Sequence, residues 1–150
     1  MPLVVNVTDG HAPIQIQPAD QLGDDRFYAF CQANPDLRIE RSAEGDIQIM
    51  PPTGGETSYR NSDLTTQLRL WAKRDGRGKS FDSNAEFLLP NGAYRSPDAS
   101  WIRSERLASL TRAQKRRFPP LCPDFVIELT SPSDRLPRSE ERRVGKECRL

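Results

Sequence analysis

The sequence predicts one α/β or α+β domain in which helices flank a single sheet. The apolar patterning runs in the order helix, hairpin, helix, hairpin, connection and strand, which is typical of a mixed architecture. The 150 residues are enough for one compact domain with a core and too few for two comfortable ones. Hydrophobic residues make up 35% and charged residues 29%, so the composition is that of a globular chain and not a disordered one.

The first part of the chain is predicted to form an arm, a short helix and a hairpin. Residues 1–20 alternate apolar and polar positions around two prolines, which indicates an extended arm. A helix is expected to begin at Asp24, where a pair of acidic residues favours an N-terminus, and to end near Asn34. Residues 37–40 and 46–50 alternate with period two around a Glu-Gly pair, and this pattern is typical of a β-hairpin.

A longer helix is predicted after residues 51–53. Its apolar residues recur at positions i, i+4, i+7 and i+8, and this spacing places them on one face of a helix. These residues are Leu64, Leu68, Trp71 and Ala72. Residues 75–78 contain two glycines and are expected to end the helix.

The remaining elements are expected to complete the sheet. Residues 80–89 and 93–103 are interpreted as two strands joined by the Pro-Asn-Gly turn at 90–92. Residues 105–117 are polar and basic, and they are expected to form a helix or a lid-like connection. Residues 123–130 contain a short apolar run that is typical of a central strand.

Composition narrows the possible chemistry. His11, in the arm, is the only histidine, so a Ser-His-Asp triad, a Cys-His pair or a histidine-containing zinc site would have to use it. An enzyme of this composition is expected to rely on carboxylates, lysine or a metal held by oxygen ligands. The net charge of +1 gives no excess of basic residues that would favour avid, unspecific binding to a DNA or RNA duplex.

No signal peptide or membrane-spanning stretch is recognised, and the expected location is the cytoplasm.

Two carboxylates stand out as candidate metal ligands. Glu128 interrupts an apolar run, and a charge in a buried strand is costly unless a cation compensates it. Exposure to solvent or an arginine partner would explain Glu128 equally well. Asp98 follows Pro97 in an expected strand, where a bulge could direct the side chain toward a site, although a local Ser-Pro-Asp turn is the simpler reading. Together the pair would suit Mg²⁺ or Mn²⁺, which can activate water for attack on a phosphodiester.

Two further features have both a structural and a functional interpretation. Glu56 lies three residues after Thr53, which matches a helix capping box. It could instead be a third carboxylate that points from the helix N-terminus toward the sheet. Residues 115–117, with Arg112 one turn earlier, form a basic run that is either solvated or in contact with phosphate.

Five segments between Met50 and Asp134 resemble the Uma-type putative restriction endonuclease family, within the PD-(D/E)XK nuclease superfamily. They are Met50–Gly54, Phe87–Gly92, Arg95–Trp101, Pro120–Leu129 and Ser131–Asp134. The resemblance implies a restriction-endonuclease-like core with a mixed central sheet flanked by helices. It assigns Asp98 to the PD motif, Glu128 to the acidic position of the second half-motif and Glu56 to an extra acidic position. It also implies Mg²⁺ or Mn²⁺ as the cofactor and DNA as the substrate, while a homodimer stays an open option.

The C-terminal end departs from that family pattern. Thr130 stands two residues after Glu128, where the superfamily motif has lysine, and the lysine is instead expected from a helix that would begin just after Leu136. Residues 138–150 show no helical period and look like a translated sequencing adapter. We therefore expect a truncated domain over residues 1–137 followed by a non-native tail. Lys146 lies in this tail and is not assigned as the catalytic lysine. The chain is accordingly expected to be an inactive fragment. The alternative function is a non-catalytic nuclease-fold module for protein or nucleic-acid interaction, which a salt-bridged Glu128 would favour.

Overall fold

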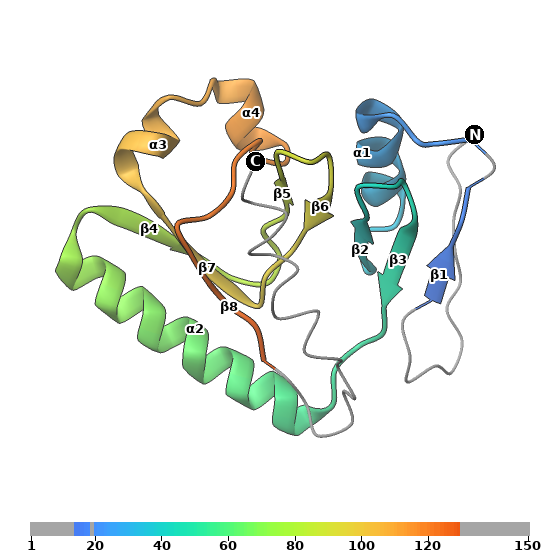
Figure 1. Cartoon of the computed structure of the whole chain (residues 1–150). Coiled ribbons are helices and arrows are strands. Elements are labelled where there is room, and N and C mark those ends of the chain that lie inside the picture. Colours follow the sequence, from blue (N-terminus) through green and yellow to red (C-terminus); the bar gives the residue numbers. More distant parts are fainter. Residues whose placement is uncertain (1–13, 19, 130–150) are drawn as a thin grey trace.

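The computed structural model describes residues 14–18 and 20–129, which form an α+β fold of two antiparallel sheets flanked by helices (Figure 1). One sheet has five strands in the order β1-β3-β2-β6-β5, and the other has three in the order β4-β7-β8. The strands are β1 Ile14–Ile16, β2 Arg38–Arg41, β3 Ile47–Met50, β4 Gly78–Phe81, β5 Phe87–Leu88, β6 Tyr94–Arg95, β7 Ala99–Arg103 and β8 Phe125–Ile127. The helices are α1 Asp24–Ala33, α2 Gly55–Asp75, α3 Ser104–Ala108 and α4 Arg112–Arg116.

The five-stranded sheet is built on the predicted hairpin. β2 and β3 pair antiparallel with Ile39 opposite Ile49, and the turn between them contains Gly45 at a φ of 98°, which favours glycine. β1 adds to the far side of β3, so part of the predicted arm is a strand. Residues 1–13 lie outside the described residues.

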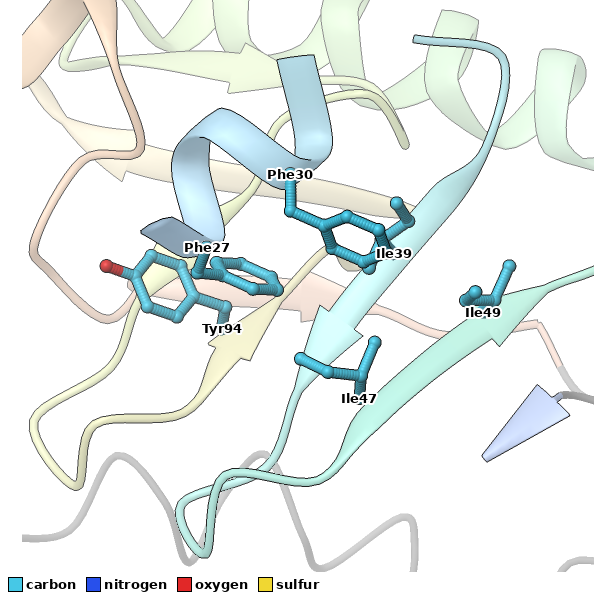
Figure 2. Close-up of a cluster of buried hydrophobic side chains, with 6 residues drawn as sticks. All are labelled: Phe27, Phe30, Ile39, Ile47, Ile49 and Tyr94. Atoms are coloured by element: carbon cyan, nitrogen blue, oxygen red, sulfur yellow. The ribbon is translucent and has the colours of Figure 1, made fainter. Parts of the chain in front are cut away.

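Helix α1 covers one face of this sheet, as its apolar spacing requires. Phe27 and Phe30 are buried and point toward the isoleucines of the hairpin (Figure 2). The ring of Phe27 lies 4.7 Å, centroid to centroid, from that of Tyr94 on β6. The cluster comprises Phe27, Phe30, Ile39, Ile47, Ile49 and Tyr94. The predicted start and end of α1 are confirmed.

Helix α2 runs beside the three-stranded sheet (Figure 1) and buries Leu68 and Ala72 of the predicted apolar face, while Leu64 is partly buried and Trp71 is exposed. Leu68 and Ala72 pack against Ala99 and Trp101 of β7. Trp71 is 45% exposed and meets Trp101 edge-on, at a ring-centroid distance of 5.3 Å. Gly76 ends the helix in the left-handed conformation at a φ of 72°, as glycine at this position commonly does.

Three structural expectations were wrong. The predicted strands 80–89 and 93–103 are each divided in two, and their parts join different sheets, so the described strands form two sheets rather than one. A turn in which Asn84 N–H donates to Asp82 Oδ1 at 3.0 Å interrupts the first strand. Strand β8 pairs with β7 alone among the described residues and is therefore not a central strand there.

The expected capping box at Thr53 was also wrong. Helix α2 has Gly54 as its N-cap, with no side-chain hydrogen bond. A capping box does form at α4, where Thr111 and Gln114 satisfy each other's backbone N–H groups. The polar connection 105–117 consists of α3 and α4, apart from its last residue and a short link, so the helical option for it is confirmed.

Candidate active site

Residues 96–98, Ser-Pro-Asp, carry the chain from one sheet to the other and are called the crossing segment. β6 ends at Arg95 in the five-stranded sheet, and β7 begins at Ala99 in the three-stranded sheet. Pro97, which lacks an N–H for a sheet ladder, lies between them and is fully buried. Asp98 is therefore placed at the start of β7 and is only 8% exposed.

Both carboxylate oxygens of Asp98 have partners. Oδ1 accepts a hydrogen bond from Arg38 Nη1 at 3.1 Å, which makes an ion pair with β2. Oδ2 accepts a 2.7 Å hydrogen bond from the backbone N–H of Leu129. Strands β7 and β8 pair with Ala99 opposite Ile127, so the residues next to that pair, Asp98 and Glu128, lie at the same end of the sheet.

Glu128 lies immediately after β8, and its side chain is exposed, so the expectation of a carboxylate inside a buried strand was wrong. The surrounding chain still desolvates the carboxylate and raises its pKa to about 7. The negative charges of Asp98 and then Glu40 raise this pKa further, while Arg38 and the backbone of Asp98 lower it. Asp98 and Glu128 therefore lie close enough for their negative charges to interact. Among the described residues, Glu128 makes no ion pair.

A third acidic residue, which sequence reasoning missed, lies beside this pair. Glu40 on β2 is only 7% exposed, and its Oε1 accepts a 2.9 Å hydrogen bond from Ser96 N–H. Its Oε2 lies 3.5 Å from Arg95 Nη1, and its Oε1 lies 3.9 Å from Arg38 Nη2. The crossing segment is thus fixed from β2, because Glu40 holds its N–H side and Arg38 donates to the carbonyl of Ser96.

A fourth carboxylate, also missed, is buried nearby. Glu86, just before β5, is 7% exposed, and its Oε1 has no hydrogen-bond partner within the described part of the chain. Burial first, and the charge of Glu40 second, raise the pKa of Glu86 to about 9. Glu86 is therefore a neutral carboxylic acid at pH 7. Because Glu86 is protonated, it adds no negative charge to the group formed by Glu40, Asp98 and Glu128.

Glu56, the third predicted site residue, lies in the first turn of α2. Its side chain is 77% exposed and forms an ion pair with Arg60, one turn further along the helix. Figure 1 shows β8 running beside α2 toward the N-terminal end of the helix. No contact of Glu56 with Asp98 is observed. Among residues 14–18 and 20–129, no group of three or more Asp, Glu, His or Cys residues is arranged to hold a metal ion.

The basic run at 115–117 has at least one structural role. Arg117 Nη1 forms a 2.9 Å ion pair with Asp25 of α1, and its guanidinium lies 4.2 Å from the ring centre of Tyr28. These contacts join α4 to α1. The positions expected for the catalytic lysine and for the tail, including Thr130 and Lys146, lie outside the described residues.

The sequence of this chain matches a known protein family. The family Uma2, described as "Putative restriction endonuclease", matches residues 24–144, which is well over half of the chain. The chain belongs to the Uma2 family. No curated protein matches the sequence. In the described ranges, no helix is both long and apolar enough to cross a membrane.

Membership of Uma2 confirms the predicted resemblance and the restriction-endonuclease-like fold class. It indicates a nuclease, with DNA as the substrate that the family description implies. The roles of Asp98, Glu128 and Glu56 stay predictions. The family match ends at residue 144, within the segment 138–150 that was expected to be foreign.

Proposed function

We propose that this chain carries the metal ligands of a Mg²⁺-dependent endonuclease that hydrolyses DNA phosphodiester bonds, and that these ligands are Asp98 and Glu128. The supporting observation is the mutual proximity of these two carboxylates at the end of β7 and β8. Burial, and after it the negative charge of Asp98, raise the pKa of Glu128. Two like charges at one site are unfavourable unless a proton or a cation compensates them.

The donor set fits a hard divalent cation. Both side chains offer carboxylate oxygens, which Mg²⁺ and Mn²⁺ prefer, and no histidine or cysteine ligand is required. Mg²⁺ is commonly held by only one or two carboxylates and retains several waters, so a group of three acidic ligands is not needed. Each oxygen of Asp98 accepts one hydrogen bond, and an ionised carboxylate has about four acceptor positions in all.

The chain's own residues prepare this site in defined ways. The N–H of Leu129, just after β8, fixes the Asp98 carboxylate, and Glu40 on β2 fixes the backbone of the crossing segment. Glu128, with its pKa at about 7, exchanges a proton near neutral pH and can offer an ionised oxygen when a cation arrives. A bound divalent cation would supply a water of lowered pKa and a positive charge at the attacked phosphate. Glu56, at the N-terminus of α2, is proposed as an accessory acidic residue.

The test is Mg²⁺-dependent cleavage of supercoiled plasmid by the purified native protein. We expect cleavage that requires Mg²⁺ and is lost in Asp98→Asn and in Glu128→Gln. Glu44→Gln, which changes an exposed acid in the β2–β3 turn, serves as the matched control and should cleave normally. Equal cleavage by the wild type and both site variants would contradict the assignment.

One observation favours the alternative, a non-catalytic module that keeps the nuclease fold. Asp98 already has a cationic partner in Arg38, so the acidic pair is partly compensated without a metal. A module of this kind would bind DNA or protein without any dependence on Asp98, Glu128 or Mg²⁺. Retention of DNA binding in both site variants, with no divalent-ion binding in the wild type, would favour it.

A further inference from the structure

Arg38 occupies a central place among the acidic residues of the candidate site. Its Nη1 donates to Asp98 Oδ1 at 3.1 Å, and its Nη2 donates to the carbonyl oxygen of Ser96. The same Nη2 lies 3.9 Å from Glu40 Oε1. One guanidinium thus contacts two carboxylates and the backbone of the crossing segment, although Arg38 and Asp98 are separated by 60 residues in sequence.

The charge of Arg38 also reaches the acids that it does not contact. It lowers the pKa of Glu128 and the pKa of Glu86, opposing the burial that raises both. Among the described residues, Arg38 is the cation that forms an ion pair with Asp98. A divalent cation held by Asp98 and Glu128 would bind Asp98 beside the guanidinium of Arg38.

The position of Arg38 is incompletely satisfied and partly open. Its Nε is buried and has no hydrogen-bond partner among the described residues, a situation that disfavours this placement of the guanidinium. Its side chain is nevertheless 30% exposed, so solvent reaches part of it. An arginine with these properties can leave Asp98 at a lower cost than a fully buried and fully bonded one.

The geometry points to Arg38 as an internal counter-ion that competes with the divalent cation for Asp98. This inference rests on the proposed function, because it requires a metal site at Asp98 and Glu128. In the metal-free protein, Arg38 neutralises Asp98 and keeps the crossing segment in place. When an ion binds, the positive charge of Arg38 opposes it, since two cations a few ångströms apart repel each other strongly at a partly buried site. Arg38 thus lowers the affinity for the ion while it stabilises the metal-free fold.

Calorimetric titration of MgCl₂ into matched variants tests this competition. Arg38→Gln removes the charge and is expected to bind Mg²⁺ at least about tenfold more tightly than the wild type. Arg38→Lys keeps the charge and should stay within about threefold of the wild type. Arg77→Gln removes an exposed arginine from its ion pair with Asp75 and serves as the control with unchanged affinity. Addition of Asp98→Asn to Arg38→Gln should abolish the tight binding.

The outcomes separate the counter-ion role from the proposed function. Equal affinities of the wild type and Arg38→Gln, with binding still lost in Asp98→Asn, would overturn the role of Arg38 and leave the metal site intact. Absence of Mg²⁺ binding in every variant would overturn the metal site and, with it, this inference.

Arg38→Gln is also informative if it fails to fold without an ion. Circular dichroism would then follow its refolding as Mg²⁺ is added. Refolding at Mg²⁺ concentrations below those that raise the melting temperature of the wild type would support the competition. No refolding at any Mg²⁺ concentration would contradict it, because the carboxylates would then need the arginine itself and not simply a cation.

Discussion

Replacement of Glu86 by glutamine should make the stability of the protein less sensitive to a rise in pH. Glu86 is 7% exposed, and burial and the charge of Glu40 raise its pKa from 4.5 to about 9. Between these two pH values the unfolded chain releases the Glu86 proton while the folded chain keeps it. The unfolded state therefore binds fewer protons, and stability is lost as the pH rises through this range.

The size of the effect follows from the two pKa values. Each pH unit in this window costs about 1.4 kcal/mol for one fully linked group. From pH 4.5 to pH 8 the loss adds up to an upper limit of about 5 kcal/mol, and relaxation around the ionised group will reduce it. Glutamine has nearly the same shape and does not ionise. Glu86→Gln should therefore gain stability relative to the wild type as the pH rises.

Urea unfolding at pH 5, 6.5 and 8 measures this difference directly. The free energy of unfolding of Glu86→Gln minus that of the wild type should increase steadily across the series. Glu44→Gln, in the exposed β2–β3 turn, is the control and should parallel the wild type. Parallel pH profiles of Glu86→Gln and the wild type would refute the reasoning, because Glu86 would then be ionised in the folded protein.

Three further substitutions test other parts of the structure. Asp98→Asn should lower the free energy of unfolding by about 1–3 kcal/mol, because it removes the charge that pairs with Arg38; an unchanged urea midpoint would contradict the ion pair. Glu128→Gln should raise the melting temperature of the metal-free protein by relieving repulsion from Asp98, and a lower melting temperature would contradict that repulsion. Gly78→Ala should cost about 1–3 kcal/mol, because the added Cβ would lie 2.4 Å from a backbone oxygen. The matched control is Gly55→Ala, whose Cβ meets nothing within 4 Å; equal urea midpoints for the two alanine variants would refute the crowding at Gly78.

Sequence patterns predicted the elements whose conformation depends on residues close together in the chain. The acidic start at Asp24 and the apolar spacing of α1 placed that helix correctly. The alternation around Gly45 placed the hairpin, and Gly76 marked the end of α2. In each case, residues close in sequence both define the conformation and satisfy the backbone hydrogen bonds.

The division of the predicted strands depends on the global fold instead. Residues 80–89 and 93–103 each contain apolar residues that suit a strand throughout, but each segment passes from one sheet to the other. The Asp82 turn and Pro97 mark these breaks locally. Such residues are equally compatible with a bulge within a continuous strand, so the sequence did not distinguish the two arrangements.

The acidic environment of the site could be predicted only in part. Asp98 and Glu128 were singled out by their places in the expected strands and then by the family resemblance, and their proximity follows from the pairing of β7 with β8. Arg38 and Glu40 alternate with apolar residues on β2 and would therefore be assigned to a solvent-facing side. Glu40 is buried because the crossing segment, more than 50 residues later in the sequence, packs over that side. A pattern within β2 carries no information about that contact.

Binding of Mn²⁺ measured by electron paramagnetic resonance tests the central claim most directly, because free and bound ions give different signals. We expect one bound Mn²⁺ per chain, displaced by excess Mg²⁺. The bound ion should be absent in Asp98→Asn and in Glu128→Gln and retained in the exposed-acid control Glu44→Gln. Equal Mn²⁺ occupancy in the wild type and both site variants, or no bound ion in the folded wild type, would contradict a metal centre at Asp98 and Glu128.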